Sequence, residues 1–464
     1  MRFTKETYLR RRDELQRRVG SGLLLFLGNK LVGMNYADNE YPFRQDSSFL
    51  YYFGLDFPNL AAVIDIDNDR TIVFGNDLTI DDIVWTGVMP SLRERCEPAG
   101  VTDTKALSEL KPYLDKCRRS GSVIHFLPPY RGEHQVWLQE LLGLLPNSQS
   151  NEASVSFIKS IVEMRNHKEA SEIAEIEEAI DISTKMHLTA YRMVRPGVHE
   201  REIAAAVAQT AAHEGYRLAF PTISTTHGQT LHNHGFIHEL HEGDIFLLDA
   251  GAETPNHYAG DLSSSMPVSE RFTSRQEEIY NIHLSSFQAA VDCLRPGVPF
   301  RKAHIAAATK ISEGLKALGL MKGDPADAAE SGAYALFFPC GLGHMMGLDV
   351  HDMENLGEQY VGYGEGMEKS KQFGFKSLRL ARELEPGFVF TVEPGIYFIP
   401  DLIDRWRSEK RFEDFICYDK LDAWKGFSGL RNELNYLITE DGARLLGRLK
   451  KPMSIEEVLE AKGM

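Results

Sequence analysis

An internal repeat is the feature of this sequence that most restricts the folds open to the chain. AYRMVRPGVHEREIAAAV at 190–207 is echoed by AVDCLRPGVPFRKAHIAA at 290–307, and GDIFLLDAG at 243–251 is echoed by GFVFTVEPG at 387–395. The first pair predicts a helix that ends at Arg-Pro-Gly-Val before a second helix begins, and the second pair predicts an apolar strand that carries one carboxylate. Two echoes in the same order favour duplication over chance. We therefore expect two pseudo-symmetric halves that face each other, with one strand carboxylate from each half at the join.

The composition is that of an ordinary globular protein. Of the 464 residues 43% are apolar and 25% are charged, and the formal net charge is −16, so disorder is excluded and no basic stripe indicates a nucleic-acid partner. The five cysteines form no CxxC pair, which argues against a disulfide framework or a cysteine zinc site. A charged N-terminus and the lack of any eighteen-residue apolar run predict no signal peptide, no membrane partner and a reducing, cytoplasmic location.

Helix and strand patterns divide the chain into two domains. Residues 1–158 open with a helical pattern over about 4–18 and continue with strand patterns at 23–27, 61–66, 70–74 and 122–127, which is typical of an α/β domain. One long amphipathic helix is expected over 168–194, after the polar stretch 146–154. The fold class is therefore α/β (α+β), with a first domain at 1–158 and the duplicated domain at 159–464.

Two carboxylates in the repeated strands need a cation. Asp249 follows Ile-Phe-Leu-Leu and Glu393 follows Phe-Val-Phe-Thr-Val, and a carboxylate is costly to bury unless it is paired or binds a metal. A hairpin centred on Pro255 sets Asp249 directly opposite Asp261, with Cβ atoms about 4.5–5.5 Å apart. This pair alone is consistent with either a hydrogen-bonded structural pair or part of a metal site.

Three further motifs add donors to this set. His344 and His351 lie in the glycine-rich segment GLGHMMGLDVHDME at 341–354, His232 lies in TLHNHGF at 230–236, and Arg431 and Glu433 share one face of a strand predicted over 429–439. A single histidine is more often a buried structural residue, and an arginine beside a carboxylate is often only a salt bridge. The combination of these motifs with the strand carboxylates favours a site.

The donors together indicate a dinuclear metal centre. The oxygen-rich set suits Mn²⁺, with Co²⁺ or Zn²⁺ as alternatives, and differs from a thiolate site. Its members are Asp249, Asp261, His344, Glu393 and Glu433. Four carboxylates are more than one ion needs, which predicts two divalent ions about 3.5–4 Å apart.

The order of these motifs resembles that of the pita-bread metallopeptidases, the group of methionine aminopeptidase, aminopeptidase P and prolidase. The resemblance rests on DAG…GD, GLGHxxGLDVHD, TVEPGIY and LRNE, and NEYPFRQDSSFLYYFGLDFPN at 39–59 is similar to the first domain of aminopeptidase P and prolidase. It implies an N-terminal aminopeptidase P-type domain, a pita-bread (creatinase/aminopeptidase-like) catalytic domain, a homodimer or homotetramer, and proline-containing peptides as substrates.

The resemblance also implies a role for each site residue. The five donors named above are the metal ligands, with Asp261 and Glu433 bridging the ions, and Glu393 also handles the proton of the attacking water. His232 and His351 hold the substrate and the tetrahedral intermediate, and Arg431 supports the site. Arg379, in SLRLARELEPG, grips the carboxylate of a dipeptide, or is a surface charge in the basic run 376–382.

Three positions depart from the pattern of the group. The step from Asp249 to Asp261 is twelve residues instead of eleven, and the extra residue is expected in the turn at 254–257. Cys340 stands where histidine is common, and Asn435 where an acidic residue is common. None of these departures removes a metal ligand.

The implied function is a metal-dependent exopeptidase, an Xaa-Pro aminopeptidase that releases the N-terminal residue from Xaa-Pro peptides by attack of a hydroxide bridging the two ions. We expect it to accept dipeptides as well, and a strict Xaa-Pro dipeptidase (prolidase) is the alternative. A catalytically silent binding module on the same fold, or a metal-independent hydrolase related to creatinase, is expected to have lost ligands, whereas all five positions are filled here.

Overall fold

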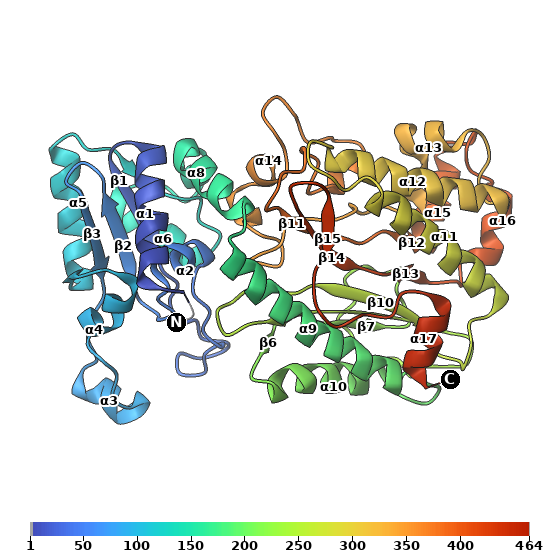
Figure 1. The fold of residues 1–464 in the computed structure, drawn as a ribbon, viewed down its shortest axis with the longest axis horizontal. Coiled ribbons are helices and arrows are strands. Elements are labelled where there is room, and N and C mark those ends of the chain that lie inside the picture. Colours follow the sequence, from blue (N-terminus) through green and yellow to red (C-terminus); the bar gives the residue numbers. More distant parts are fainter. Residues whose placement is uncertain (1–2, 464) are drawn as a thin grey trace. The chain divides into compact units, whose positions relative to one another are not determined.

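The computed structural model describes residues 3–463, which form two compact units (Figure 1). The first unit consists of Met1–Arg165 and Met353–Tyr360, and the second of Asn166–Asp352 and Val361–Met464. The first division falls inside helix α8 (Val155–Asn166), the helix that also contains the expected domain boundary at 158 and 159. None of the helices within 3–463 combines the length and the apolar character that crossing a bilayer requires.

The first unit is built on a five-stranded mixed sheet in the order β4-β3-β2-β1-β5. Its three central strands pair antiparallel, and the two edge strands run parallel to their neighbours. The strands are β1 (Leu23–Leu27), β2 (Ala61–Asp65), β3 (Arg70–Phe74), β4 (Asp103–Lys105) and β5 (Ile124–His125). The central apolar strands are almost entirely buried, as expected for a sheet covered on both faces. The predicted α/β character is confirmed, although the strand predicted over 122–127 is only two residues long.

Helices precede, connect and follow these strands. They are α1 (Lys5–Val19), α2 (Ser47–Phe53), α3 (Ile80–Thr86), α4 (Leu92–Cys96), η1 (Glu97–Ala99), η2 (Leu107–Glu109), α5 (Leu110–Arg119), α6 (Gly132–Leu142), α7 (Gln149–Glu152), α8 and η4 (Glu354–Leu356), and α14 (Glu358–Val361) begins in this unit. Two arginines of α1 donate from their buried guanidinium groups to backbone carbonyls, Arg11 to Tyr51 and Arg12 to Tyr52 and Ala99. The first helix is thereby fixed on α2.

Two helix pairs in the second unit carry the predicted repeat (Figure 1). The pairs are α9 (Ala170–Met193) with α10 (Glu200–His213), and α11 (Ser274–Val291) with α12 (Phe300–Ala317). In the first half the N–H of Gly197 donates to Leu240 O over 2.9 Å, and in the second half the N–H of Gly297 donates to Leu384 O over the same distance. Both glycines have positive φ, 86° and 76°. The two Arg-Pro-Gly-Val turns are thus held by equivalent bonds, as duplication predicts.

Small sheets fill the second unit between these helices. Their orders are β10-β8-β7, β11-β14-β15, β12-β13 and β6-β9. The strands are β6 (Arg217–Leu218), β7 (Ile223–Thr225), β8 (Ile245–Ala250), β9 (Ala252–Glu253), β10 (Leu262–Pro267), β11 (Val389–Val392), β12 (Gly395–Tyr397), β13 (Gly429–Arg431), β14 (Leu434–Ile438) and β15 (Ala443–Leu445). The remaining helices are α13 (Pro325–Ser331), η3 (Ala333–Leu336), η5 (Phe375–Ser377), α15 (Pro400–Ser408), α16 (Tyr418–Leu421), η6 (Asp422–Trp424) and α17 (Ile455–Lys462). The repeated strands β8 and β11 lie in different sheets, one in each half.

The pairing of β8 with β10 corrects the predicted hairpin register. Asp249 pairs with Ser263 and Ala250 with Leu262, so Asp261 is diagonal to Asp249 and not directly opposite to it. The difference is two residues along the partner strand. Because side chains alternate with a period of two, this shift leaves Asp249 and Asp261 on the same face of the ladder.

The cause of the shifted register is the centre of the turn. The N–H of Thr254 donates to Tyr258 O over 2.9 Å, which centres the connection on Asn256 and not on Pro255. His257 adopts φ 69° in this turn and lies 2.5 Å from a Glu253 carboxylate oxygen through its Nδ1. This left-handed residue lies in the turn where the additional residue is expected.

The prediction of a single strand over 429–439 is also wrong. β13 ends at Arg431, which pairs with Gly395 of β12, and β14 begins at Leu434, which pairs with Val392 of β11. The chain changes sheets because the Asn432 side chain accepts a bond from the N–H of Ser265, and the N–H of Glu433 donates to Ser263 O. Arg431 and Glu433 therefore flank a break in the strand.

Gly251 provides a test of the close packing behind Asp249. A Cβ atom at this position would overlap the carbonyl oxygen of Gly260 across the hairpin. We expect Gly251→Ala to destabilise the protein by about 1–3 kcal/mol, because backbone atoms must move to relieve the overlap. Urea unfolding measures the loss. Gly442→Ala is the matched control, since a Cβ there meets nothing within 4 Å, and an equal effect of both substitutions would contradict this account.

Candidate active site

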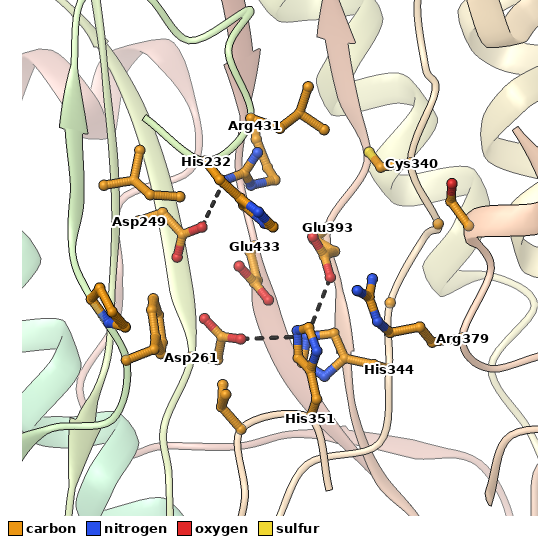
Figure 2. A pocket seen from close by; sticks show the side chains of 18 of the residues that line it. His232, Asp249, Asp261, Cys340, His344, His351, Arg379, Glu393, Arg431 and Glu433 are labelled. Atoms are coloured by element: carbon orange, nitrogen blue, oxygen red, sulfur yellow. Dashed lines mark hydrogen bonds and ion pairs between the residues drawn. The ribbon is translucent and has the colours of Figure 1, made fainter. Parts of the chain in front are cut away.

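All nine side chains expected in the site line one pocket of about 260 Å³ in the second unit (Figure 2). They are His232, Asp249, Asp261, His344, His351, Arg379, Glu393, Arg431 and Glu433. Cys340 lines the same pocket. The chain positions of these residues span two hundred residues, so the fold brings together what the sequence separates.

The carboxylates enter the pocket from the strands of both halves. Asp249 lies on β8, Asp261 directly precedes β10, Glu393 directly follows β11, and Glu433 lies between β13 and β14. Figure 2 shows these side chains converging on a common space. Asp261 and Glu433 are 5% and 2% exposed, so their charges have almost no access to water.

His344 is placed in the same space by its backbone. Its N–H donates to the Thr391 hydroxyl over 3.1 Å, and the N–H of Thr391 donates to His344 O over 3.0 Å. Its ring Nδ1 lies 3.1 Å from Met345 O, and because a carbonyl only accepts, Nδ1 carries the proton. When the ring is neutral its lone pair therefore lies on Nε2, which faces the carboxylates.

The distances around His344 leave room for a cation. Its Nε2 lies 3.4 Å from Asp261 Oδ2 and 3.4 Å from Glu393 Oε1. One ligand atom each of Asp261, His344 and Glu433 lies within 4.8 Å of the other two. Donor atoms that each present a lone pair and lie this close together suit a divalent ion between them.

Arg431 organises the other side of the pocket. Its Nη2 donates to Asp249 Oδ2 over 2.6 Å, its Nε to Ser263 Oγ over 2.9 Å and its Nη1 to the Tyr397 hydroxyl over 2.8 Å. The Ser263 hydroxyl then donates to Glu433 Oε2 over 2.9 Å. One buried guanidinium thus orients two carboxylates, directly and through a serine.

The crowding of carboxylates raises their proton affinity in the metal-free protein. Burial, reinforced by Asp249 and Glu393, raises the pKa of Asp261 well above its usual range. Burial, reinforced by Asp261 and Glu393, does the same for the pKa of Glu433. Burial also raises the pKa of Asp249, although Arg431 opposes it. Like charges this close need either protons or cations.

Two orphaned oxygens support cations as the native partners. Asp249 Oδ1 and Glu433 Oε1 are buried and have no hydrogen-bond partner among residues 3–463. Buried carboxylate oxygens are rarely left without a donor, because their desolvation is costly. The donor set therefore fits divalent metal ions, in agreement with the predicted centre.

Cys340 lies in the pocket as a free thiol. Burial, together with the nearby Glu393 carboxylate, raises the pKa of this thiol to about 12. A thiol that holds its proton at neutral pH is a poor nucleophile. We therefore do not expect Cys340 to act as a nucleophile.

Sequence reasoning did not identify several residues that hold the site. Ser263, Thr391 and Tyr397 bond to the side chains of Arg431, Glu433, Glu393 or the backbone of His344. Ser263 and Thr391 each lie two residues from a predicted carboxylate, so strand periodicity is the signal by which they could have been found. Tyr397 has no such signal, because its contact depends on the pairing of β12 with β13.

The chain matches two family models. Residues 174–440 match metallopeptidase family M24, and residues 8–125 match the aminopeptidase P N-terminal domain. The first match covers more than half of the chain and contains every residue of the pocket described above.

Curated relatives and solved structures agree with these matches. The chain is 29% identical to the Escherichia coli Xaa-Pro aminopeptidase, with 99% of this chain and 98% of that protein covered, and 30% identical to the Homo sapiens Xaa-Pro dipeptidase, with 91% and 85% covered. A zinc-substituted E. coli aminopeptidase P in complex with product has a TM-score of 0.81 at 27% identity, with 100% of this chain and 99% of that chain covered. The Pseudomonas aeruginosa aminopeptidase PepP shares the fold, with a TM-score of 0.81 at 23% identity and coverages of 100% and 98%.

The raised carboxyl pKa values predict that metal binding releases protons. Asp261 and Glu433 hold protons above the usual carboxyl range, so an entering Mn²⁺ ion must displace them. We expect net proton release that declines as the pH rises through the raised pKa values of these carboxyls, and Mn²⁺ binding that becomes tighter over the same range. The metal-free protein should also lose stability as the pH rises through these raised values.

Calorimetric titration of the metal-free protein in buffers of different ionisation enthalpy measures the released protons. The Asp261→Asn variant is the internal comparison, since it lacks one of the two carboxyls and should release fewer. Equal heats in all buffers would show that the carboxylates are already ionised before the metal binds.

Proposed function

The chain belongs to metallopeptidase family M24, and we propose that it is a metal-dependent exopeptidase that cleaves the bond between an N-terminal residue and proline. The observation that carries this proposal is the convergence of four carboxylates, the imidazole of His344 and three further histidines on one pocket. Relatives of similar identity include both an Xaa-Pro aminopeptidase and an Xaa-Pro dipeptidase. Both names refer to the Xaa-Pro bond.

We propose that two divalent ions bind between Asp249, Asp261, His344, Glu393 and Glu433. The predominance of oxygen donors favours Mn²⁺, and the single imidazole leaves Co²⁺ and Zn²⁺ as alternatives. When bound, such ions polarise a carbonyl group and lower the pKa of water. The remaining chemistry falls to side chains of the pocket.

Glu393 is proposed to handle the proton. Its Oε1 accepts a bond from the Thr391 hydroxyl over 3.3 Å, which orients the carboxylate toward His344. A carboxylate held there takes a proton from the attacking water and returns it to the proline nitrogen as the peptide bond breaks. This transfer is needed because proline nitrogen in a tertiary amide leaves poorly without a proton.

His232 and His351 are proposed to hold the substrate carbonyl and the tetrahedral intermediate. The ring centroid of His351 lies 4.1 Å from that of His344, so it reaches the same space from the pocket wall. Burial, with the positive charge of Arg431, lowers the pKa of His232, which is therefore neutral at pH 7 and donates one hydrogen bond. Donors aimed at a developing oxyanion are worth a large part of the rate.

Apolar side chains of the pocket provide a surface for the proline ring. Phe220, Pro221, Ile223, Leu231 and Val350 line it. A rigid apolar ring gains from such a wall without hydrogen bonds. These residues support selection for proline next to the scissile bond.

Arg379 is proposed to set the response to substrate length. It lines the pocket and is half-buried, so it is not simply a solvated charge of the basic run. A guanidinium there binds the carboxylate that ends a dipeptide, whereas a longer peptide has a neutral amide at that point. We propose an Xaa-Pro aminopeptidase that also takes dipeptides, with the strict dipeptidase as the alternative.

A reducing, cytoplasmic setting is also proposed. All five cysteines are free thiols, which is typical of proteins that are not exposed to an oxidising compartment. Assembly into a homodimer or homotetramer stays a prediction.

Arg379→Ala tests substrate length. Wild-type protein loaded with Mn²⁺ should cleave both Xaa-Pro and Xaa-Pro-Yaa peptides. The substitution should raise the KM for Xaa-Pro about 10- to 100-fold, which corresponds to the loss of one charge-assisted hydrogen bond. The KM for the tripeptide should not change. Lys376→Ala is the matched control, because Lys376 is exposed in the same basic run and does not line the pocket. Tripeptides left intact by the wild type would establish the strict dipeptidase.

The roles assigned to Glu393 and His351 predict different effects when each residue is replaced by alanine. Glu393→Ala should abolish turnover and lower the metal content, because it removes a ligand and the proton carrier together. His351→Ala should lower kcat about 10²- to 10³-fold with metal content retained, since this side chain is assigned to substrate. Steady-state kinetics and elemental analysis measure both, with exposed His213→Ala as the control. Loss of both ions in the His351 variant would overturn the assignment.

A further inference from the structure

A second group of metal-ligating side chains lies outside the candidate active site. Glu200 is the first residue of α10, and His227 and His238 lie on the segment 226–242 between β7 and β8. One ligand atom of each lies within 4.8 Å of the other two, and the two imidazole centroids are 4.2 Å apart. None of the three lines the pocket of the candidate active site.

Glu200 is held in a fixed orientation. It is 0% exposed, and its Oε1 accepts bonds from the Thr225 hydroxyl, the Thr226 N–H and the Thr226 hydroxyl, at 3.0, 2.9 and 3.3 Å. Its Oε2 accepts one bond, from the N–H of His238 over 3.1 Å. A carboxylate oxygen has two lone pairs, so Oε2 keeps one that is pre-oriented by the bonds around it.

The buried charge of Glu200 has no cationic partner among residues 3–463. The lysine that lines the adjacent cavity, Lys425, is occupied by Asp404 and Asp422, at 2.6 and 3.1 Å from its Nζ. Burying a carboxylate without a cation is costly even when it is hydrogen-bonded. The position therefore calls for a positive charge from outside the chain.

The two histidines can supply neutral ligands to the same point. The Thr226 hydroxyl gives its proton to Glu200, so it accepts from His227 Nδ1 over 3.2 Å, and the lone pair of His227 lies on Nε2. Within the described chain, the ring nitrogens of His238 have no hydrogen-bond partner, and the ring is held by its contact with His227. Both rings thus have a nitrogen available for coordination.

A cavity of about 350 Å³ gives access to the two histidines of this group. It is lined by both histidines, and by Glu239, His241 and Asp244. The two acidic side chains make the approach favourable for a cation. The cavity shares no lining residue with the candidate active-site pocket, so the two sites can be occupied independently.

We propose that Glu200, His227 and His238 form a separate Zn²⁺ site that fastens the segment 226–242 to the start of α10. Two imidazoles and one carboxylate are a common protein ligand set for zinc, with water as the fourth ligand, and differ from the oxygen-rich set of the candidate active site. The same segment carries His232 and His234, which line the active-site pocket. Zinc bound here fixes the chain on both sides of His232.

Zinc counting on the full-length protein tests this proposal. Wild type, the double variant His227→Ala/His238→Ala and the control His213→Ala are dialysed against a zinc-buffered solution and analysed for zinc per chain. The control carries an exposed histidine substitution on the same helix that begins at Glu200. The double variant should bind one zinc ion fewer per chain than the wild type and the control. Because this difference does not depend on peptidase activity, it is separate from the proposed function.

Equal zinc content in all three proteins would overturn the proposal. If the double variant does not fold, as judged by circular dichroism, the wild-type protein decides the question. Crystals soaked in Zn²⁺ should show an anomalous peak about 2.0–2.2 Å from a ring nitrogen of His227 and of His238 and from Glu200 Oε2. A crystal with zinc in the carboxylate pocket and no peak at this position would reject the site.

Discussion

Charge compensation in one small pocket is the constraint on which the second unit depends. Four carboxylates surround a space of about 260 Å³, and Arg431 is the one buried guanidinium that lines it. Its guanidinium group donates hydrogen bonds to Asp249, Ser263 and Tyr397, which fixes three strands relative to one another. The excess negative charge that remains is what makes the pocket a site for divalent ions. The charges of the pocket thus determine both the arrangement of the strands around it and its affinity for cations.

Duplication explains how one chain builds such a pocket. The two Arg-Pro-Gly-Val turns are held by equivalent backbone bonds, and each is followed later in the chain by a strand with one carboxylate, Asp249 on β8 and Glu393 directly after β11. The other candidate ligands differ between the halves, since His344 and Glu433 come from the second half and Asp261 from the first. A site between two halves of one fold can therefore be asymmetric, with different proton and metal roles on its two sides.

The sequence was sufficient to predict which side chains meet in one pocket, but not how the strands beside them pair. Carboxylates after apolar runs and histidines between glycines are local signals, and the pocket contains all of them. The hairpin register was wrong because the centre of a five-residue turn depends on the left-handed His257, which composition does not reveal. The break between β13 and β14 was missed because it depends on a bond from a distant strand to Asn432. Tertiary contacts of ordinary polar residues are what local patterns omit.

The makeup of the first unit has a consequence for how the chain acquires its structure. That unit includes Met353–Tyr360, eight residues that follow His351 and Asp352 directly. During synthesis the first unit therefore cannot be completed until residue 360 has left the ribosome. By that time most of the second unit has been made. A fragment cut after Arg165 lacks this piece as well. The completion of the first unit is thus tied to the second through the order of translation.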